Sequence, residues 1–284
     1  MAISAFIPEI WSAELLVALR TRLVFAQPAI TNRDYEGDIS QSGDTVRITS
    51  ISDPTIGNYV PNVTSITPEN LTDAQRSLVI DQSKYFSFEV DDVEMRQAKG
   101  NVMPQAMARA AYKLAVVVDQ YIAAFYTSVP AATDLGTVSF VVATPTNAYD
   151  LGLVPLSVKM DEADIPADNR WVVVPPWFYG RLLLDSRFIK VNESGSSSGL
   201  RNAEVGSAAG FTIYKSNNVV LSSGDDYEVL AGAGNTAISY AEQINKVEAY
   251  RPQSSFSDAV KGLHLWGAKV VRPDHLAGFT ASIT

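Results

Sequence analysis

The stretch SLVIDQSKYFSFEVDD, residues 77–92, alternates between apolar and polar side chains, which is typical of a strand with one dry and one wet face. An upstream segment, Gly43–Ile51, alternates in the same way, and a polar connector, Ser52–Gln75, separates the two. A lone two-stranded ribbon is marginal in water. We therefore expect the apolar face of this arm to be covered, most simply by another copy of the chain. The apolar positions are Leu78, Ile80, Phe86, Phe88 and Val90.

Composition limits the kinds of protein that this chain can be. Of its 284 residues, 46% are hydrophobic and 19% are charged, as in folded proteins. The chain has no cysteine, which excludes disulfides and thiolate chemistry. No apolar run approaches the roughly 20 residues of a membrane-spanning helix. The net charge is −9, without the basic cluster that marks a nucleic-acid binder. We expect a soluble, non-exported protein that does not read nucleic-acid sequence.

Three further segments predict the fold class. Asn101–Ser128 is rich in alanine, has Pro104 near its start and carries an apolar stripe at steps of three and four, which predicts one long helix. Trp171–Val174 is an apolar run that two prolines stop, which predicts a buried strand leading into a helix over Trp177–Leu184. We also expect an amphipathic helix over Pro8–Phe25. These elements predict an α+β fold in which helices cover a mixed sheet.

Two short motifs match catalytic or cofactor patterns but lack the elements that those sites need. Gly195–Gly199 matches the nucleophile elbow G-x-S-x-G, yet it lies in a Ser/Gly-rich stretch. Gly232–Ala237 matches the dinucleotide fingerprint G-x-G-x-x-G/A, yet no helical pattern follows it. We interpret the first as a flexible loop and the second as a hairpin turn. A serine hydrolase that uses Ser196–Ser198 is the alternative from another class of protein.

The two histidines and the neighbouring acidic pairs do not form a recognisable site. His264 and His275 lack a spacing typical of zinc ligands, and we interpret His264 as a strand residue that faces solvent or a neighbour. The pairs Asp91–Asp92 and Asp225–Asp226 point to opposite faces of a strand. We therefore expect no catalytic residue, no cofactor and no metal site, and a structural protein rather than an enzyme.

Four stretches together resemble the major capsid (coat) proteins of tailed bacteriophages, whose fold is shared with encapsulins. These stretches are FIPEIWSAELLVAL, NRWVVVPPWFYGRLLLDSRF, GSAAGFTIYKSNNV and FSDAVKGLHLWGAKVVRPD. The resemblance implies five parts. They are an N-terminal arm (residues 1–33), an extended two-stranded loop (34–90), a peripheral domain with a long spine helix (91–130), an axial domain (131–239) and a C-terminal return to the peripheral domain (240–284).

The resemblance also implies a function. It implies hexamers and pentamers that build an icosahedral head around double-stranded DNA, assembled in the host cytoplasm and located in the virion capsid. Its further partners would be a portal, a separate scaffolding protein and minor or decoration proteins. Each extended loop would lie across a neighbouring subunit. The expected intersubunit contacts are Tyr59, Val60, Ile66, Leu78, Ile80, Phe86 and Phe88. An encapsulin-type compartment is the alternative with the same fold.

The chain departs from one feature of the proteins that it resembles. Some members of this fold join their subunits covalently through a lysine in the extended loop. The first lysine of this chain is Lys84, at the base of the loop. We therefore expect a shell without such isopeptide bonds.

Overall fold

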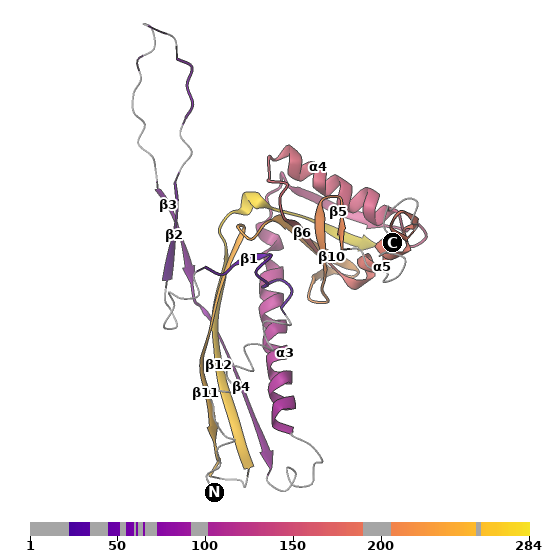
Figure 1. Cartoon of the computed structure of the whole chain (residues 1–284). Helices are drawn as coiled ribbons and strands as arrows, with labels where there is room; N and C mark the ends of the chain where they lie inside the picture. The colour runs from indigo at the N-terminus through magenta and orange to yellow at the C-terminus, as the bar shows by residue number, and fades with distance from the viewer. Residues whose placement is uncertain are drawn as a thin grey trace.

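The described part of the chain forms two β-sheets, a long helix that lies along one of them, and a two-stranded ribbon that projects away (Figure 1). The structure is a computed structural model that describes residues 23–34, 45–51, 55–59, 61, 65, 73–91, 102–189, 206–253 and 257–284. Most of the helix expected over Pro8–Phe25 and the whole loop Gly195–Gly199 lie outside these residues. The described end of the first segment, Leu23–Phe25, is not helical.

The first sheet has four strands, three of them long. In spatial order they are β1 (Thr31–Asn32), β11 (Ile238–Tyr250), β12 (Ser257–Val270) and β4 (Gln82–Asp91). The two pairings on either side of β12 are antiparallel, whereas β1 runs parallel to β11. Strand β4 is therefore an edge of this sheet.

The long helix α3 (Val102–Ala123) lies along one face of the four-stranded sheet, as Figure 1 shows, and ends in a 3₁₀ turn, η2 (Ala124–Ser128). The apolar stripe explains this packing, since Met107, Ala111, Leu114 and Val118 are buried in one core with Trp266 of β12. The ring of Tyr121 meets the ring of Trp266 edge-on, 4.8 Å between centroids. The predicted long helix is confirmed. We call this side of the sheet its helix face.

The second sheet has seven strands and carries the shorter helices. Its strands are β5 (Asp134–Phe140), β13 (Leu276–Ile283), β10 (Asp226–Ala233), β6 (Arg170–Val174), β8 (Phe211–Lys215) and β7 (Ser207–Ala208), with β9 (Val220–Ser223) also paired to β10. Its helices are the π-helical turn η3 (Ala148–Leu153), α4 (Val154–Glu162), α5 (Pro176–Leu184) and α6 (Ser186–Ile189), and a 3₁₀ turn, η4 (Pro273–His275), precedes β13. Every residue of β6 is buried, which confirms the predicted strand and the helix after it.

The C-terminal segment divides between the two sheets. The segment was expected to return to the peripheral domain, and its strands β11 and β12 belong to the four-stranded sheet. Strand β13 instead pairs with β10 and with β5, so the expectation is wrong for the last residues of the chain. The reason is their apolar character, because Leu276, Ala277, Phe279 and Ala281 are buried in the core of the seven-stranded sheet.

The projecting ribbon is formed by β2 (Thr45–Ile51) and β3 (Asp73–Val79), which pair antiparallel from Thr45 opposite Val79 to Ile51 opposite Asp73. The single strand predicted over residues 77–92 is divided in the structure. Strand β3 ends at Val79, and β4 begins at Gln82 and pairs with β12 along its whole length. Only the first three residues of the quoted stretch, 77–79, therefore belong to the ribbon. We call residues 34–80 the arm, and we call its last three residues, 78–80, the arm base.

Candidate assembly surfaces

The outer part of the arm exposes apolar side chains. Ile56 is 95% exposed and Tyr59 is 64% exposed. Tyr59 was expected at an intersubunit contact, and its exposure leaves it free for one. Val60 and Ile66, expected beside it, lie outside the described residues. Ile56 was missed by the sequence reasoning, although its place in a polar connector is the signal that identifies it.

The base of the arm, in contrast, is covered by its own chain. Leu78 and Ile80 are buried in a small cluster with Ala241 of β11 and Leu265 of β12. Because Leu265 and Trp266 are neighbours on one strand, they point to opposite faces, and the arm base covers the face opposite α3. Leu78 and Ile80 were expected to contact another subunit. This is corrected here, because both side chains are buried against the four-stranded sheet of their own chain.

A close backbone approach fixes this crossing. A Cβ atom at Gly267 of β12 would lie 2.4 Å from the carbonyl oxygen of Val79, which only glycine avoids. The Lys269 ammonium donates a hydrogen bond of 2.9 Å to the carbonyl oxygen of Ser77. Strand β3 of the arm is thus held on β12 by the burial of apolar side chains, by close contact with Gly267 and by the hydrogen bond from Lys269.

The segment that precedes the arm in the chain, Leu23–Asp34, is held by α3. We call it the root segment. The Asp119 carboxylate on α3 accepts backbone N–H donors from Val24, Phe25 and Ala26 at 3.0–3.4 Å. The Asn218 side-chain amide also donates to it, at 3.4 Å. Burial raises the pKa of Asp119, and these hydrogen bonds partly offset that rise. One buried acid therefore joins the helix, the root segment and the loop before β9.

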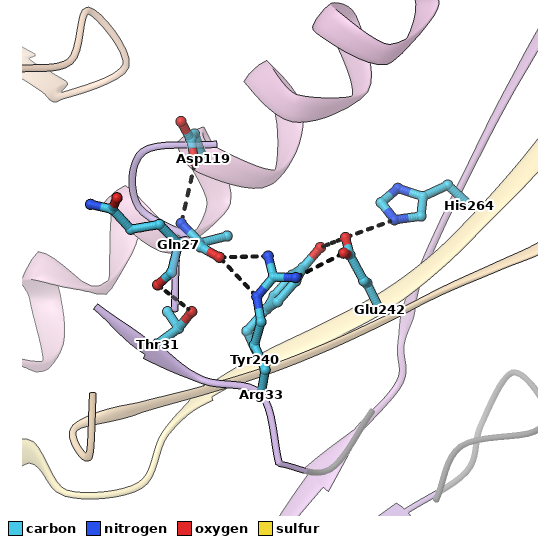
Figure 2. Close-up of polar contacts among 8 residues, drawn as sticks. Gln27, Thr31, Arg33, Asp119, Tyr240, Glu242 and His264 are labelled. Carbon is cyan, nitrogen blue, oxygen red and sulfur yellow. Dashed lines mark hydrogen bonds and ion pairs between the residues drawn. The ribbon is translucent and has the colours of Figure 1, made fainter. Parts of the chain in front are cut away.

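Arg33 connects the root segment to the four-stranded sheet (Figure 2). Its Nε and Nη2 atoms donate to the Ala26 carbonyl oxygen at 3.1 and 2.6 Å, and Nη1 lies 2.9 Å from Oε1 of Glu242 on β11. Its guanidinium also lies over the ring of Tyr240, 5.0 Å from the centroid. These contacts fix the orientation of the last side chain before the arm, because the planar guanidinium uses several donors at once.

Glu242 is the acid at the centre of this cluster. Its side chain is fully buried, and Oε2 accepts a hydrogen bond of 2.7 Å from the Tyr240 hydroxyl. His264 of β12 is 1% exposed, with Nε2 3.6 Å from the same oxygen. Burial acts to raise the pKa of Glu242, but His264, Arg33 and Tyr240 together lower it to about 2. His264 was expected to be a strand residue that faces solvent or a neighbour, and it lies on β12, buried against a neighbouring side chain, Glu242, and away from solvent.

A groove of about 500 Å³ opens between the edge strand β4 and the helix α3. Phe86 and Phe88, both expected at intersubunit contacts, are half-buried and stack with centroids 6.1 Å apart. The sequence reasoning missed the helix side of the groove, because it depends on how α3 packs. The groove is lined by Lys84, Tyr85, Phe86, Ser87 and Phe88 from β4 and by Ala106, Arg109, Ala110, Lys113, Leu114 and Val117 from α3.

The motifs that matched catalytic or cofactor patterns can be placed in the structure only in part. The segment Gly232–Ala237 covers the end of β10 and the turn that leads to β11, so the predicted turn is present. The predicted hairpin is wrong, because β10 and β11 belong to different sheets and do not pair with each other. No cluster of potential metal ligands is found among the described residues. None of the helices in the described ranges is long and apolar enough to span a membrane. Ser196–Ser198, the residues of the hydrolase alternative, lie outside the described part.

Comparison with solved structures defines the class of protein to which this fold belongs. The structure named "Mycobacterium phage Che8" is 32% identical over 90% of each chain, with a TM-score of 0.73. The capsid of cyanophage P-SCSP1u is 18% identical over 92% of this chain and 89% of that chain, with a TM-score of 0.71. A virus-like particle from Pyrococcus furiosus is 14% identical over 95% and 98%, with a TM-score of 0.58. The fold is that of tailed-phage major capsid proteins.

Comparison of the sequence alone gives the family. The model of the phage capsid protein family matches residues 73–280, most of the chain. A search of curated proteins found no match. The chain belongs to the phage capsid protein family. It is a structural protein of the virion capsid, and the resemblance drawn from its sequence is confirmed.

Proposed function

We propose that this chain assembles into hexamers and pentamers that close an icosahedral head around double-stranded DNA, without catalytic activity of its own. Assembly takes place in the host cytoplasm with a separate scaffolding protein, a portal and minor or decoration proteins. The observation that carries the proposal is the arm, a thin ribbon with exposed apolar side chains at Ile56 and Tyr59. The net charge of −9 supports contact with the packaged DNA that is weak and independent of its sequence.

The groove between β4 and α3 is the surface that receives the arm of a neighbouring copy. Two properties favour this occupant. The walls of the groove are apolar, as the exposed side chains of the arm require, and Lys84, Arg109 and Lys113 place three cations around them. Residues 34–75 of the arm carry seven acidic side chains and one basic side chain. Opposite charges of this kind orient two surfaces and exclude wrong partners.

Charge reversal in the groove tests this contact. Arg109 and Lys113 are exposed on α3, so Arg109→Glu with Lys113→Glu should leave the fold intact. We expect shells to form at least about tenfold less efficiently, since two repulsive contacts replace two attractive ones at each interface. Electron microscopy and light scattering measure the yield. Adding Asp53→Arg and Glu69→Arg in the arm should restore assembly, because the charges are then exchanged between the two surfaces.

The possible results distinguish the arm–groove contact from the formation of a shell. Full assembly of the groove variant would disprove the arm–groove contact and leave the shell proposal standing. A wild-type chain that forms neither shells nor capsomers, even with its scaffolding protein, would disprove the shell proposal. An encapsulin-type compartment predicts an enzyme inside the particle instead of DNA. The 32% identical phage relative favours DNA, whereas the archaeal particle at 14% identity shares only the fold.

A further inference from the structure

Strand β12 has an open edge beside the point where the arm crosses it. Strand β4 begins at Gln82, opposite Trp266, and in the described part of the chain no strand pairs with β12 beyond Trp266 on that side. The cause is the crossing at Gly267, because the chain reaches this edge only after it has passed over the face opposite α3. The last residues of β12, Ala268–Val270, therefore pair with β11 alone.

The backbone groups at the open edge are those of Ala268 and Val270. The N–H of Val271 donates a hydrogen bond of 2.8 Å to the carbonyl oxygen of Ala237, which directly precedes β11. Successive backbone groups of an antiparallel strand point to opposite edges, so those of Val270 and Ala268 point away from β11. Open strand edges of this kind are surfaces on which another extended chain can pair.

A cavity of about 390 Å³ lies beside this edge. Tyr121 of α3 and Phe125 of η2 contribute aromatic rings that meet edge-on, 5.5 Å between centroids, and the exposed Val79 contributes an apolar side chain from the arm base. We call the cavity together with the open edge the edge slot. It combines backbone hydrogen-bonding groups with aromatic rings, as an extended peptide with an aromatic side chain requires. Its other lining residues are Ser77, Asp81, Ser128, Ala268, Lys269 and Val270.

The edge slot continues the groove between β4 and α3. The helix side of the groove ends at Val117, and the helix side of the slot begins one turn later at Tyr121. Phe125 and Ser128 then follow at steps of four and three, so the groove and the slot lie along the same side of the helix. On the sheet, β4 lines the groove, and β12 lines the slot just beyond the first residue of β4. The two surfaces therefore form one trough along α3.

The arm is long enough to occupy both parts of this trough. From Lys113 in the groove to Phe125 in the slot, the helix rises about 18 Å, at about 1.5 Å per residue. An extended chain from Asp53 to Tyr59 spans about 20 Å, at about 3.3 Å per residue. An arm whose Asp53 meets Lys113 therefore brings the exposed Tyr59 to the aromatic rings of the slot.

We propose that residues 55–59 in the arm of a neighbouring copy add a short strand to the open edge of β12, with their Tyr59 packed against Tyr121 and Phe125. The backbone of β12 supplies the hydrogen bonds, and the aromatic rings bury the tyrosine side chain. This docking rests on the proposed contact between arm and groove. It goes beyond that contact because it assigns the end of β12 as the place where the tip of the arm binds.

The variant Val270→Pro tests the pairing at the edge. Proline has no N–H, and a strand tolerates it where the N–H points away from its partner, so the pairing of β12 with β11 should remain. We expect the yield of shells, measured by electron microscopy and light scattering, to fall at least about tenfold, because every copy loses this pairing. Val270→Ala is the matched control, since it shortens the same side chain but keeps the N–H, and it should assemble like the wild type. Urea unfolding checks that both variants fold.

Crosslinking locates the tip of the arm directly. The chain has no cysteine, so Asn58→Cys combined with Ser128→Cys places only two thiols in each copy. Asn58 is next to Tyr59, and Ser128 is an exposed residue of the slot. A short bis-maleimide reagent should join these thiols between copies in assembled shells, which gives covalent oligomers on a denaturing gel. Asn58→Cys combined with Gly180→Cys is the control, because Gly180 lies in α5 beside the other sheet, and it should give none.

Two results would overturn the docking. One is assembly of Val270→Pro at the yield of the wild type, and the other is a Ser128→Cys pair that crosslinks no better than the Gly180→Cys pair. Should Val270→Pro fail to fold, the crosslinks decide. Either result with wild-type shells present leaves the shell proposal standing. A wild-type chain that never assembles overturns the shell proposal and the docking together.

Discussion

The carboxylate of Glu242 stays ionised where burial alone favours the neutral acid. Burial acts to raise its pKa, and His264, Arg33 and Tyr240 lower it to about 2, below the ordinary 4.5. A buried ion pair adds little net stability over an apolar pair, whereas removing one of its partners is costly. We infer that the cluster specifies geometry, since it fixes the direction in which Arg33, and with it the arm, leaves the sheet.

Acid should weaken the folded state through Glu242. Because its folded pKa is lowered, its contribution is complete above about pH 4.5 and is lost as the pH falls toward 2. Over that range the wild type should lose roughly 3 kcal/mol relative to Glu242→Gln, at about 1.4 kcal/mol per pKa unit. Urea unfolding of both proteins at about pH 7 and about pH 2.5 measures this change. The opposite contribution of Asp119 is present in both proteins and cancels. A difference that stays constant with pH would contradict the expectation.

At the scale of elements, the quoted stretch shows what the sequence could predict. Its alternation correctly indicates strands with one apolar face, and the stripe of α3 correctly predicts a long helix, because both are local periodicities. The cover of Leu78 and Ile80 is not local, since Ala241 and Leu265 lie far along the chain. Alternation with a period of two shows that one face of a strand is buried. It does not show which sheet covers that face. For this reason the prediction wrongly assigned that cover to another copy of the chain.

The same limit explains the surfaces that were found only in the structure. His264 reads as an ordinary strand residue, and its contact with Glu242 depends on the register of β11 against β12. Phe86 and Phe88 could be selected as contact residues from their alternation alone. The cations Arg109 and Lys113 could not, because the groove exists only once α3 packs beside β4.

Gly267 permits the arm to cross β12, and its replacement should loosen that crossing. In Gly267→Ala the new methyl group meets the Val79 carbonyl oxygen at 2.4 Å, so the backbone of the arm must shift. We expect a loss of about 1–3 kcal/mol, as for an overpacked core. Urea unfolding measures it. Gly180→Ala is the matched control, because nothing lies within 4 Å of its new methyl group in α5. Equal stability of both variants would show that the crossing tolerates a side chain.

At the scale of the whole molecule, the two surfaces of the proposed contact, the arm and the groove, lie in different places. The arm base covers the face of the four-stranded sheet opposite α3, whereas the groove opens between β4 and α3. In the proposed contact each copy offers its arm to one neighbour and its groove to another. Such a contact is heterologous, and heterologous contacts close into rings when the rotation between copies divides a full turn. Hexamers and pentamers are two such closures of one contact.

A shell built in this way should be held together without covalent links through the arm. The first lysine of the chain is Lys84, beyond the end of the arm, so the arm has no side-chain amine that can form an isopeptide bond. The absence of cysteine excludes disulfides as well. When mature particles are boiled in detergent, this chain should therefore run at its monomer mass, with or without reductant. A ladder at multiples of this mass would contradict the expectation, and peptide mapping of its bands would then show which lysine outside the arm forms the link.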